Sequence, residues 1–192
     1  MLFDYGDKTI QIKIVYYGPA MSGKTTSLKR LFNHFGRKDT LKSIESTTGR
    51  TLFFDFGILF FQGTEWNIKF LIYSATGQDF YASTRPSTII GVDGIIFVVD
   101  SQISYFSQNL RSWNELYGFF SHKIYEMPVI ICLNKWDLEN KINKDDFLNH
   151  INYHLYEKID IVQTIATNGV GIYDSFRKLL NFIFPQINLK TH

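Results

Sequence analysis

Short apolar runs alternate along the chain with amphipathic stretches, and the two patterns predict different elements. Runs that are continuously apolar, or that alternate with a period of two, are typical of strands; they occupy residues 9–17, 51–56, 67–73, 94–100, 128–133 and 159–165. Stretches with apolar residues every three or four positions are typical of helices; they occupy residues 28–35, 103–120, 144–156 and 171–184. Because most strands are followed by a helix, the order predicts an α/β fold with a mostly parallel sheet and helices on both faces.

The second and third predicted strands, 51–56 and 67–73, have no helix between them. Their connection is interrupted by residues that favour turns, at Gly57, Gln62 and Gly63. A hairpin is therefore expected there. The predicted sheet has six strands, one of them antiparallel to the others.

The composition is that of an ordinary globular domain. A chain of 192 residues suffices for one domain over residues 1–192 with a full-sized core, and the segment 37–50 reads as a polar, turn-rich connection. The net charge is +2 without a basic cluster, so a nucleic-acid partner is not expected. Neither a run long enough to span a membrane nor a lipidation motif occurs. We therefore expect a cytoplasmic protein without a direct membrane anchor, in which the single cysteine, Cys132, is a small buried residue.

The strongest chemical motif lies between the first strand and the first helix. Residues 18–25 read G-P-A-M-S-G-K-T, which matches the phosphate-binding pattern G-x-x-x-x-G-K-T. Glycines let backbone N–H groups approach a phosphate closely, Lys24 reaches the β- and γ-phosphates, and the Thr25 hydroxyl can bind Mg²⁺. The loop also opens a helix, whose N-terminus favours anions. The residues expected to hold the phosphates are Gly18, Ala20, Met21, Ser22, Gly23, Lys24, Thr25 and Thr26.

A second motif distinguishes guanine from adenine. Asn134, Lys135 and Asp137 form the sequence N-K-x-D directly after an apolar strand. A carboxylate at Asp137 accepts hydrogen bonds from guanine N1–H and N2–H₂, which adenine cannot offer, and the Lys135 stem can lie along the base. After the last strand, the backbone of Ala166 and Thr167 stands where guanine O6 would be met. Together these residues predict GTP and GDP as the ligands.

A phosphate-binding loop by itself also fits ATP-dependent kinases and ATPases. A kinase would need an acidic acceptor site and a lid, and the sequence shows neither. The N-K-x-D motif also disfavours ATP, because adenine would leave a buried carboxylate unpaired.

These motifs resemble those of the Ras-like small GTPases over essentially the whole chain, and among them the bacterial and archaeal MglA subfamily. The stretches that carry the resemblance are residues 13–19, 50–56, 73–78 and 91–95. The resemblance implies a P-loop small G-domain that acts as a Mg²⁺·GTP switch. Its hydrolysis would be slow intrinsically and stimulated by a homodimeric, roadblock-fold activator similar to MglB. It further implies motility or polarity effectors and recruitment to a cell pole, since that subfamily sets cell polarity for gliding or type IV pilus motility.

Matching positions imply roles for the residues of the two switch segments. Thr51 resembles the threonine that binds Mg²⁺ and meets the γ-phosphate, and Arg50 resembles a built-in arginine finger that stabilises charge on the transferred phosphoryl group. Gln78 resembles the glutamine that orients the attacking water, and Gly77 stands where an N–H contact with the γ-phosphate is needed. The alternatives are a solvated loop charge at Arg50 and a polar loop residue at Gln78.

The activator is expected to order these segments rather than to donate an arginine of its own. We expect its contacts along the exposed second strand and around Tyr81, Arg85 and Pro86. Arg50 and Gln78 would then point toward the nucleotide.

The chain departs from most small GTPases just before the glutamine. Those proteins carry D-x-x-G there, whereas residues 74–77 read S-A-T-G, so the aspartate that holds Mg²⁺ through water is missing. The MglA subfamily also lacks it. Asp55, on the same face of an extended strand as Thr51, is a candidate for a more distant charge. The missing aspartate leaves a second function open, a GTP-binding scaffold with little or no turnover that acts through partner binding.

Overall fold

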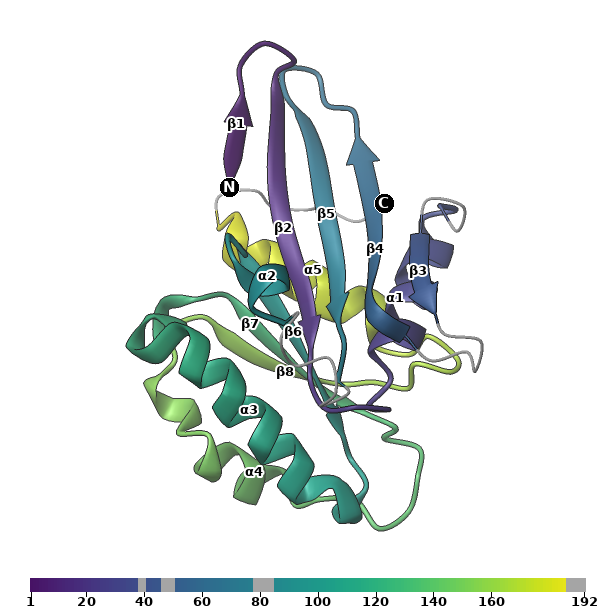
Figure 1. Ribbon diagram of the computed structural model, residues 1–192, viewed down its shortest axis with the longest axis vertical. Coiled ribbons are helices and arrows are strands. Elements are labelled where there is room, and N and C mark those ends of the chain that lie inside the picture. Colours follow the sequence, from purple (N-terminus) through teal and green to yellow (C-terminus); the bar gives the residue numbers. More distant parts are fainter. Residues whose placement is uncertain (38–40, 46–50, 78–84, 186–192) are drawn as a thin grey trace.

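The computed structural model describes residues 1–37, 41–45, 51–77 and 85–185, with the backbone alone at residues 42–45 and 51–54. Within these ranges one eight-stranded sheet has the order β3-β4-β5-β2-β6-β7-β8, and β1 pairs with β2 (Figure 1). The strands are β1 (Leu2–Asp4), β2 (Thr9–Tyr17), β3 (Leu41–Glu45), β4 (Thr51–Phe61), β5 (Asn67–Ala75), β6 (Gly94–Asp100), β7 (Val129–Asn134) and β8 (Ile159–Gln163). The α-helices are α1 (Lys24–His34), α2 (Arg85–Ile89), α3 (Phe106–Phe120), α4 (Lys144–His150) and α5 (Ile172–Ile183). Short 3₁₀ helices are η3 (Ile103–Tyr105), η4 (Ser121–Glu126) and η5 (Tyr153–Leu155).

The predicted α/β class and mostly parallel sheet are confirmed. Strands β5, β2, β6, β7 and β8 run parallel to one another, while β4 is antiparallel to β5. All six predicted strands are present. Two short strands were not predicted: β1, which is exposed along its whole length, and β3, which lies at the sheet edge within the segment expected to be a turn-rich connection.

Several element boundaries differ from the prediction, and three of these differences have a clear place in the chain. The strand β4 continues through Gly57 to Phe61, because this glycine makes room for a helix residue: a Cβ there would lie 2.4 Å from Cζ of Phe32. The helix expected over 144–156 ends at His150 and is followed by Asn152 in a left-handed conformation with φ 53°. The strand expected over 159–165 ends at Gln163.

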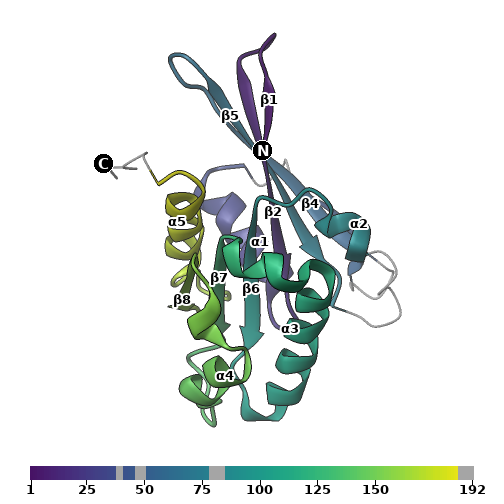
Figure 2. The same ribbon diagram turned by 90° about the vertical axis from the view of Figure 1, so that its left-hand side faces the viewer.

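The two faces of the sheet carry separate cores. Alternation along β2 sends Ile14 to one face and Val15 to the other. Helices α1 and α5 cover the first face, and α2, α3 and α4 cover the second, so that the sheet lies between α5 and α3 (Figure 2). The ends of the β1–β2 and β4–β5 hairpins project beyond these helices (Figures 1 and 2).

Parallel pairing brings the carboxyl ends of the central strands to one edge of the sheet. In register, Tyr17 lies beside Phe97 and Asp100 beside Asn134. The phosphate-binding motif leaves β2 at this edge and the N-K-x-D motif leaves β7 there. Two motifs that are more than one hundred residues apart in the sequence are therefore neighbours, as expected for ligand sites in α/β sheets.

Candidate functional site

The loop between β2 and α1 has the backbone geometry that a phosphate-binding loop needs. Gly18 has φ 140° and Gly23 has φ 103°, values that disfavour any residue with a side chain. Neighbouring atoms also leave no room for a side chain at either position. A Cβ on Gly18 would lie 2.3 Å from the Val98 carbonyl oxygen, and a Cβ on Gly23 would lie 2.2 Å from Asn134 Nδ2. The loop ends where α1 begins at Lys24, so the N-terminus of this helix lies at the predicted phosphate position, and helix N-termini favour anions.

The Lys24 ammonium is buried inside this loop. Its Nζ donates to the carbonyl oxygens of Gly18 at 2.9 Å and Pro19 at 2.6 Å. The pKa of Lys24 is lowered to about 7, chiefly by burial and then by the charge of Arg85, while the charge of Asp55 opposes the shift. A bound phosphate would add the opposite charge and restore the protonated form. The site is therefore built to receive an anion.

A carboxylate lies beside the predicted Mg²⁺ ligand of the loop. The Thr25 hydroxyl donates to Oδ2 of Asp55 at 2.5 Å, and Asp55 is fully buried on β4. Hydroxyl and carboxylate oxygens are the donors that Mg²⁺ prefers, so the two residues fit that ion. Thr51 begins the same strand. We expected Asp55 to act at a distance; the structure instead places its carboxylate in contact with Thr25.

Asn134 joins three parts of the site through its side-chain amide. Its Nδ2 donates to the Ser22 carbonyl at 2.7 Å, and its Oδ1 accepts from the Ala166 N–H at 2.9 Å and from Thr164 Oγ1 at 3.2 Å. The phosphate-binding loop and the loop after β8 are thus fixed relative to the N-K-x-D segment. This contact engages the Ala166 N–H, whose bond to guanine O6 stays a prediction, as does the role of the exposed Thr167 backbone.

Lys135 and Asp137 differ in their surroundings. Lys135 Nζ contacts Oδ2 of the fully buried Asp100 at 2.6 Å and lies 5.4 Å from the centre of the Tyr105 ring. Asp100 therefore holds the lysine stem in place; the sequence signal for this contact was the carboxylate that ends the otherwise apolar strand β6. Asp137 is exposed to solvent, where a base can reach its carboxylate.

Gly77 lies directly against the phosphate-binding loop. A Cβ at Gly77 would be 2.4 Å from the Ala20 nitrogen, so the two backbones touch only because this residue is glycine. Arg50 and Gln78, the two predicted catalytic residues, lie outside the described residues, as does Tyr81.

Arg85 is not the surface residue that we expected for activator binding. Its relative exposure is 6%, and its guanidinium contacts the Thr76 carbonyl and the Glu115 carboxylate of the same chain. Pro86, the next residue, is exposed and remains accessible to a partner. This burial was not predictable from the sequence, because the carboxylate that Arg85 contacts lies on α3.

This sheet order, with a phosphate-binding loop and an N-K-x-D loop at one edge, defines the class of small GTPases. The sequence model of the ADP-ribosylation factor family matches residues 1–183, and the chain belongs to this family of Ras-like GTPases. It is similar to the mutual gliding-motility protein MglA of Myxococcus xanthus, with 34% identity over 96% of both chains. It is also similar to ADP-ribosylation factor-like protein 6 of Caenorhabditis elegans, with 28% identity over 93% of this chain and 88% of that one.

A solved structure supports the fold. The Arl6 BBS3 small GTPase of Trypanosoma brucei, determined with the bound nucleotide analogue GppNp, superposes with a TM-score of 0.67 at 16% identity. The match covers 93% of this chain and 100% of that chain. In the described part of the present chain, none of the helices is long and apolar enough to cross a membrane.

Proposed function

We propose that this protein is a Mg²⁺-dependent GTP switch that hydrolyses GTP slowly and is stimulated by a partner. Membership of a small-GTPase family gives the class of activity. The observation that carries the finer proposal is the contact between the Thr25 hydroxyl and the buried Asp55 carboxylate. It supplies a negative charge next to the metal ligand in a chain that has Ser74 at the position of the usual aspartate.

In this proposal the phosphates lie in the loop from Gly18 to Thr26, with the Lys24 ammonium against the β- and γ-phosphates. Thr25 and Thr51 hold Mg²⁺, and Asp55 orients the Thr25 hydroxyl toward it. Mg²⁺ held there would supply positive charge that offsets the negative charge of the phosphates. The guanine base binds Asp137 and packs along Lys135, whose position is fixed by Asp100.

Hydrolysis then depends on two further side chains. Gln78 orients the attacking water, and Arg50 stabilises the charge that develops on the phosphoryl oxygens as the bond breaks. Both must be brought to the γ-phosphate, which makes the unassisted reaction slow. A scaffold with little turnover is the alternative, and Ser74 in place of the aspartate is the observation that favours it.

The similarity to MglA supports a partner of a particular kind. We infer a homodimeric, roadblock-fold activator similar to MglB, which orders both switch segments from the β4 side and from the exposed surface around Pro86. Effectors of motility or polarity and recruitment to a cell pole belong to the same proposal, which is supported by the similarity to the mutual gliding-motility protein of Myxococcus xanthus.

Single-turnover hydrolysis of GTP tests the switch against the scaffold. Purified protein loaded with radiolabelled GTP is followed with Mg²⁺, with Mg²⁺ plus the roadblock dimer, and with EDTA. We expect slow release of phosphate with Mg²⁺ and a large acceleration by the dimer. Tight binding without phosphate release in every condition would favour the scaffold.

A further inference from the structure

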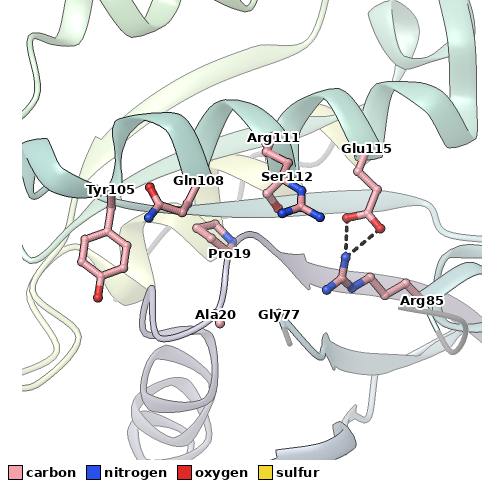
Figure 3. A pocket seen from close by; sticks show the side chains of 9 residues that line it. All are labelled: Pro19, Ala20, Gly77, Arg85, Tyr105, Gln108, Arg111, Ser112 and Glu115. Carbon is pink, nitrogen blue, oxygen red and sulfur yellow. Dashed lines mark hydrogen bonds and ion pairs between the residues drawn. The ribbon is translucent and has the colours of Figure 1, made fainter. Parts of the chain in front are cut away.

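A pocket with a volume of about 150 Å³ separates the phosphate-binding loop from α3, and an ion pair closes one end of it (Figure 3). Arg85 Nη1 contacts the two carboxylate oxygens of Glu115 at 2.7 and 2.5 Å. The Arg85 side chain is 7% exposed and that of Glu115 29%. Solvent is largely excluded from the Arg85 guanidinium, so separating it from the Glu115 carboxylate would cost free energy. The ion pair therefore stabilises the arrangement in which the two groups are in contact.

The same guanidinium makes a contact with the chain just after β5. Arg85 Nε donates to the carbonyl oxygen of Thr76 at 2.9 Å. A guanidinium is planar and presents its donors in a rigid fork. With Glu115 on one side of the fork and Thr76 on another, the plane of the group is fixed, and the carbonyl is held with it.

Thr76 and Gly77 share this peptide group, so that fixing one end directs the other. The peptide is trans, and its C=O and N–H point in opposite directions within one plane. The hydrogen bond to the Thr76 oxygen therefore sets the direction of the Gly77 N–H. This peptide also lies against the phosphate-binding loop, since a Cβ on Gly77 would be 2.4 Å from the Ala20 nitrogen.

The charge of Arg85 is felt within the phosphate site as well. It is the second cause, after burial, of the lowered pKa of Lys24. Arg85 thus lies close to the phosphate site, while its Nε is directed at Thr76 and its Nη1 at Glu115.

We propose that Arg85 is a positioning residue for recognition of the γ-phosphate: anchored by Glu115, it holds the Thr76–Gly77 peptide so that the Gly77 N–H meets that phosphate. This inference rests on the proposed function, in which Gly77 makes that contact. The inference also gives α3 a role in distinguishing GTP from GDP, because Glu115 on α3 anchors Arg85 across the pocket. GDP has no γ-phosphate, so its binding does not depend on this arrangement.

The test measures the ratio of the dissociation constants for a non-hydrolysable GTP analogue and for GDP, both with Mg²⁺. The hydrogen bond from the Gly77 N–H to the charged γ-phosphate contributes to the affinity for the analogue but not to that for GDP. Arg85→Ala should therefore weaken binding of the analogue by about tenfold or more relative to binding of GDP. Glu115→Gln should shift the ratio in the same direction by less, because the guanidinium keeps its bond to Thr76 but loses its charged anchor. If Arg85 served only the folding of the protein, its loss would change the affinities for the GTP analogue and for GDP together.

A charge-exchanged double variant, Arg85→Glu with Glu115→Arg, separates the ion pair from the contact with Thr76. It restores opposite charges across the pocket, but a carboxylate at position 85 cannot donate to a carbonyl. We expect thermal stability to recover toward wild type while the nucleotide ratio stays shifted. Recovery of the ratio would overturn the proposal, because the ion pair alone would then suffice.

Arg111→Ala is the matched control for charge. Arg111 is exposed on α3 and lines the same pocket. We expect its loss to leave the nucleotide ratio near wild type, and a fall equal to that of Arg85→Ala would contradict the proposal. Wild-type protein that bound neither guanine nucleotide would refute the proposed function, whereas wild-type binding with unchanged ratios in the Arg85 and Glu115 variants would refute this inference alone.

Discussion

At the scale of single residues, the site depends on charges held in fixed contact. Lys24 donates to two carbonyl oxygens, Thr25 donates to Asp55, and Lys135 contacts Asp100. In two of these three contacts a fully buried carboxylate fixes the group expected to meet the nucleotide or its metal. Such carboxylates support a site as much as the ligands themselves, because they set the direction of the groups that bind.

The first residue prediction concerns the metal. Asp55→Asn keeps the shape of the side chain but removes its charge, so the affinity for Mg²⁺ in the GTP complex should fall by about 10–100-fold, as for other outer contacts of metal sites. Titration of Mg²⁺ against the rate of nucleotide release measures this. Nucleotide affinity in EDTA is the control and should change little. An unchanged Mg²⁺ titration would remove Asp55 from the site.

The second concerns the base. Asp137→Asn should move the preference from guanosine toward xanthosine nucleotides, because the amide presents a donor where xanthine has a carbonyl. Competition between GTP and XTP for binding measures the change. Glu139→Gln, which removes an exposed charge two residues away, is the control and should keep the preference for GTP. GTP preference in both variants would disprove the assignment.

The third uses the lowered pKa of Lys24. The folded, nucleotide-free protein binds this proton less tightly than the unfolded chain, so unfolded protein holds more protons between pH 7 and 10. The contribution of Lys24 to the free energy of unfolding should therefore increase as pH rises through that range. The free energy of unfolding of wild type and Lys24→Met, measured across it, should show a steeper rise in wild type. Equal slopes would show that Lys24 is not desolvated.

At the scale of elements, β4 is tied to α1 through a position without a side chain. The ring of Phe32, which is fully buried, occupies the space where a Cβ on Gly57 would lie, and Leu41 Cδ1 is 3.1 Å from the same point. A strand residue thus decides how closely the first helix packs on the sheet. This helix starts at the phosphate-binding loop, so the packing also positions the site.

Gly57→Ala should therefore destabilise the protein by about 1–3 kcal/mol, the usual cost of overpacking a core. Thermal or urea unfolding measures the change, and adding Phe32→Leu should recover part of it. The control is Gly118→Ala, because Gly118 lies within α3 and a Cβ there meets open space; alanine in a helix should raise stability by about 0.5–1 kcal/mol. If both alanine variants were equally stable, the tight contact at Phe32 would be absent in solution.

At the scale of the whole molecule, the residues proposed for catalysis come from segments that no single element brings together. The loop after β2, the start of β4 and the end of β5 meet at one edge of the sheet, and Arg50 and Gln78 adjoin the last two. In the proposed switch, a partner that contacts both would control hydrolysis without adding a residue of its own.

Arg50→Ala should consequently remove nearly all of the hydrolysis stimulated by the dimeric activator, a loss of roughly 10³–10⁵ in rate, while GTP affinity stays near that of wild type. Single-turnover hydrolysis with saturating activator measures it. Gln78→Leu should behave alike and keep the protein in the GTP state. Full stimulation of the Arg50 variant would place the arginine in the activator instead.

The sequence alone predicted the fold class, the six main strands and both nucleotide motifs, because these depend on local patterns. Apolar runs, helical periodicity and glycines at fixed spacing follow from backbone and solvent physics within a few residues. Boundaries were less secure where a local pattern continued past the real end, as in the helix that ends at His150.

Only the tertiary structure decided which distant charges meet. Asp55 lies 30 residues from Thr25, Lys135 lies 35 from Asp100, and Glu115 lies 30 from Arg85, and each partnership depends on strand register and helix packing. A charged residue reads as a surface residue in sequence, since burying it without a partner is costly. The fold can place an oppositely charged partner beside such a residue, which makes its burial possible. Arg85 was therefore expected on the surface, and it is buried because the fold places Glu115 beside it.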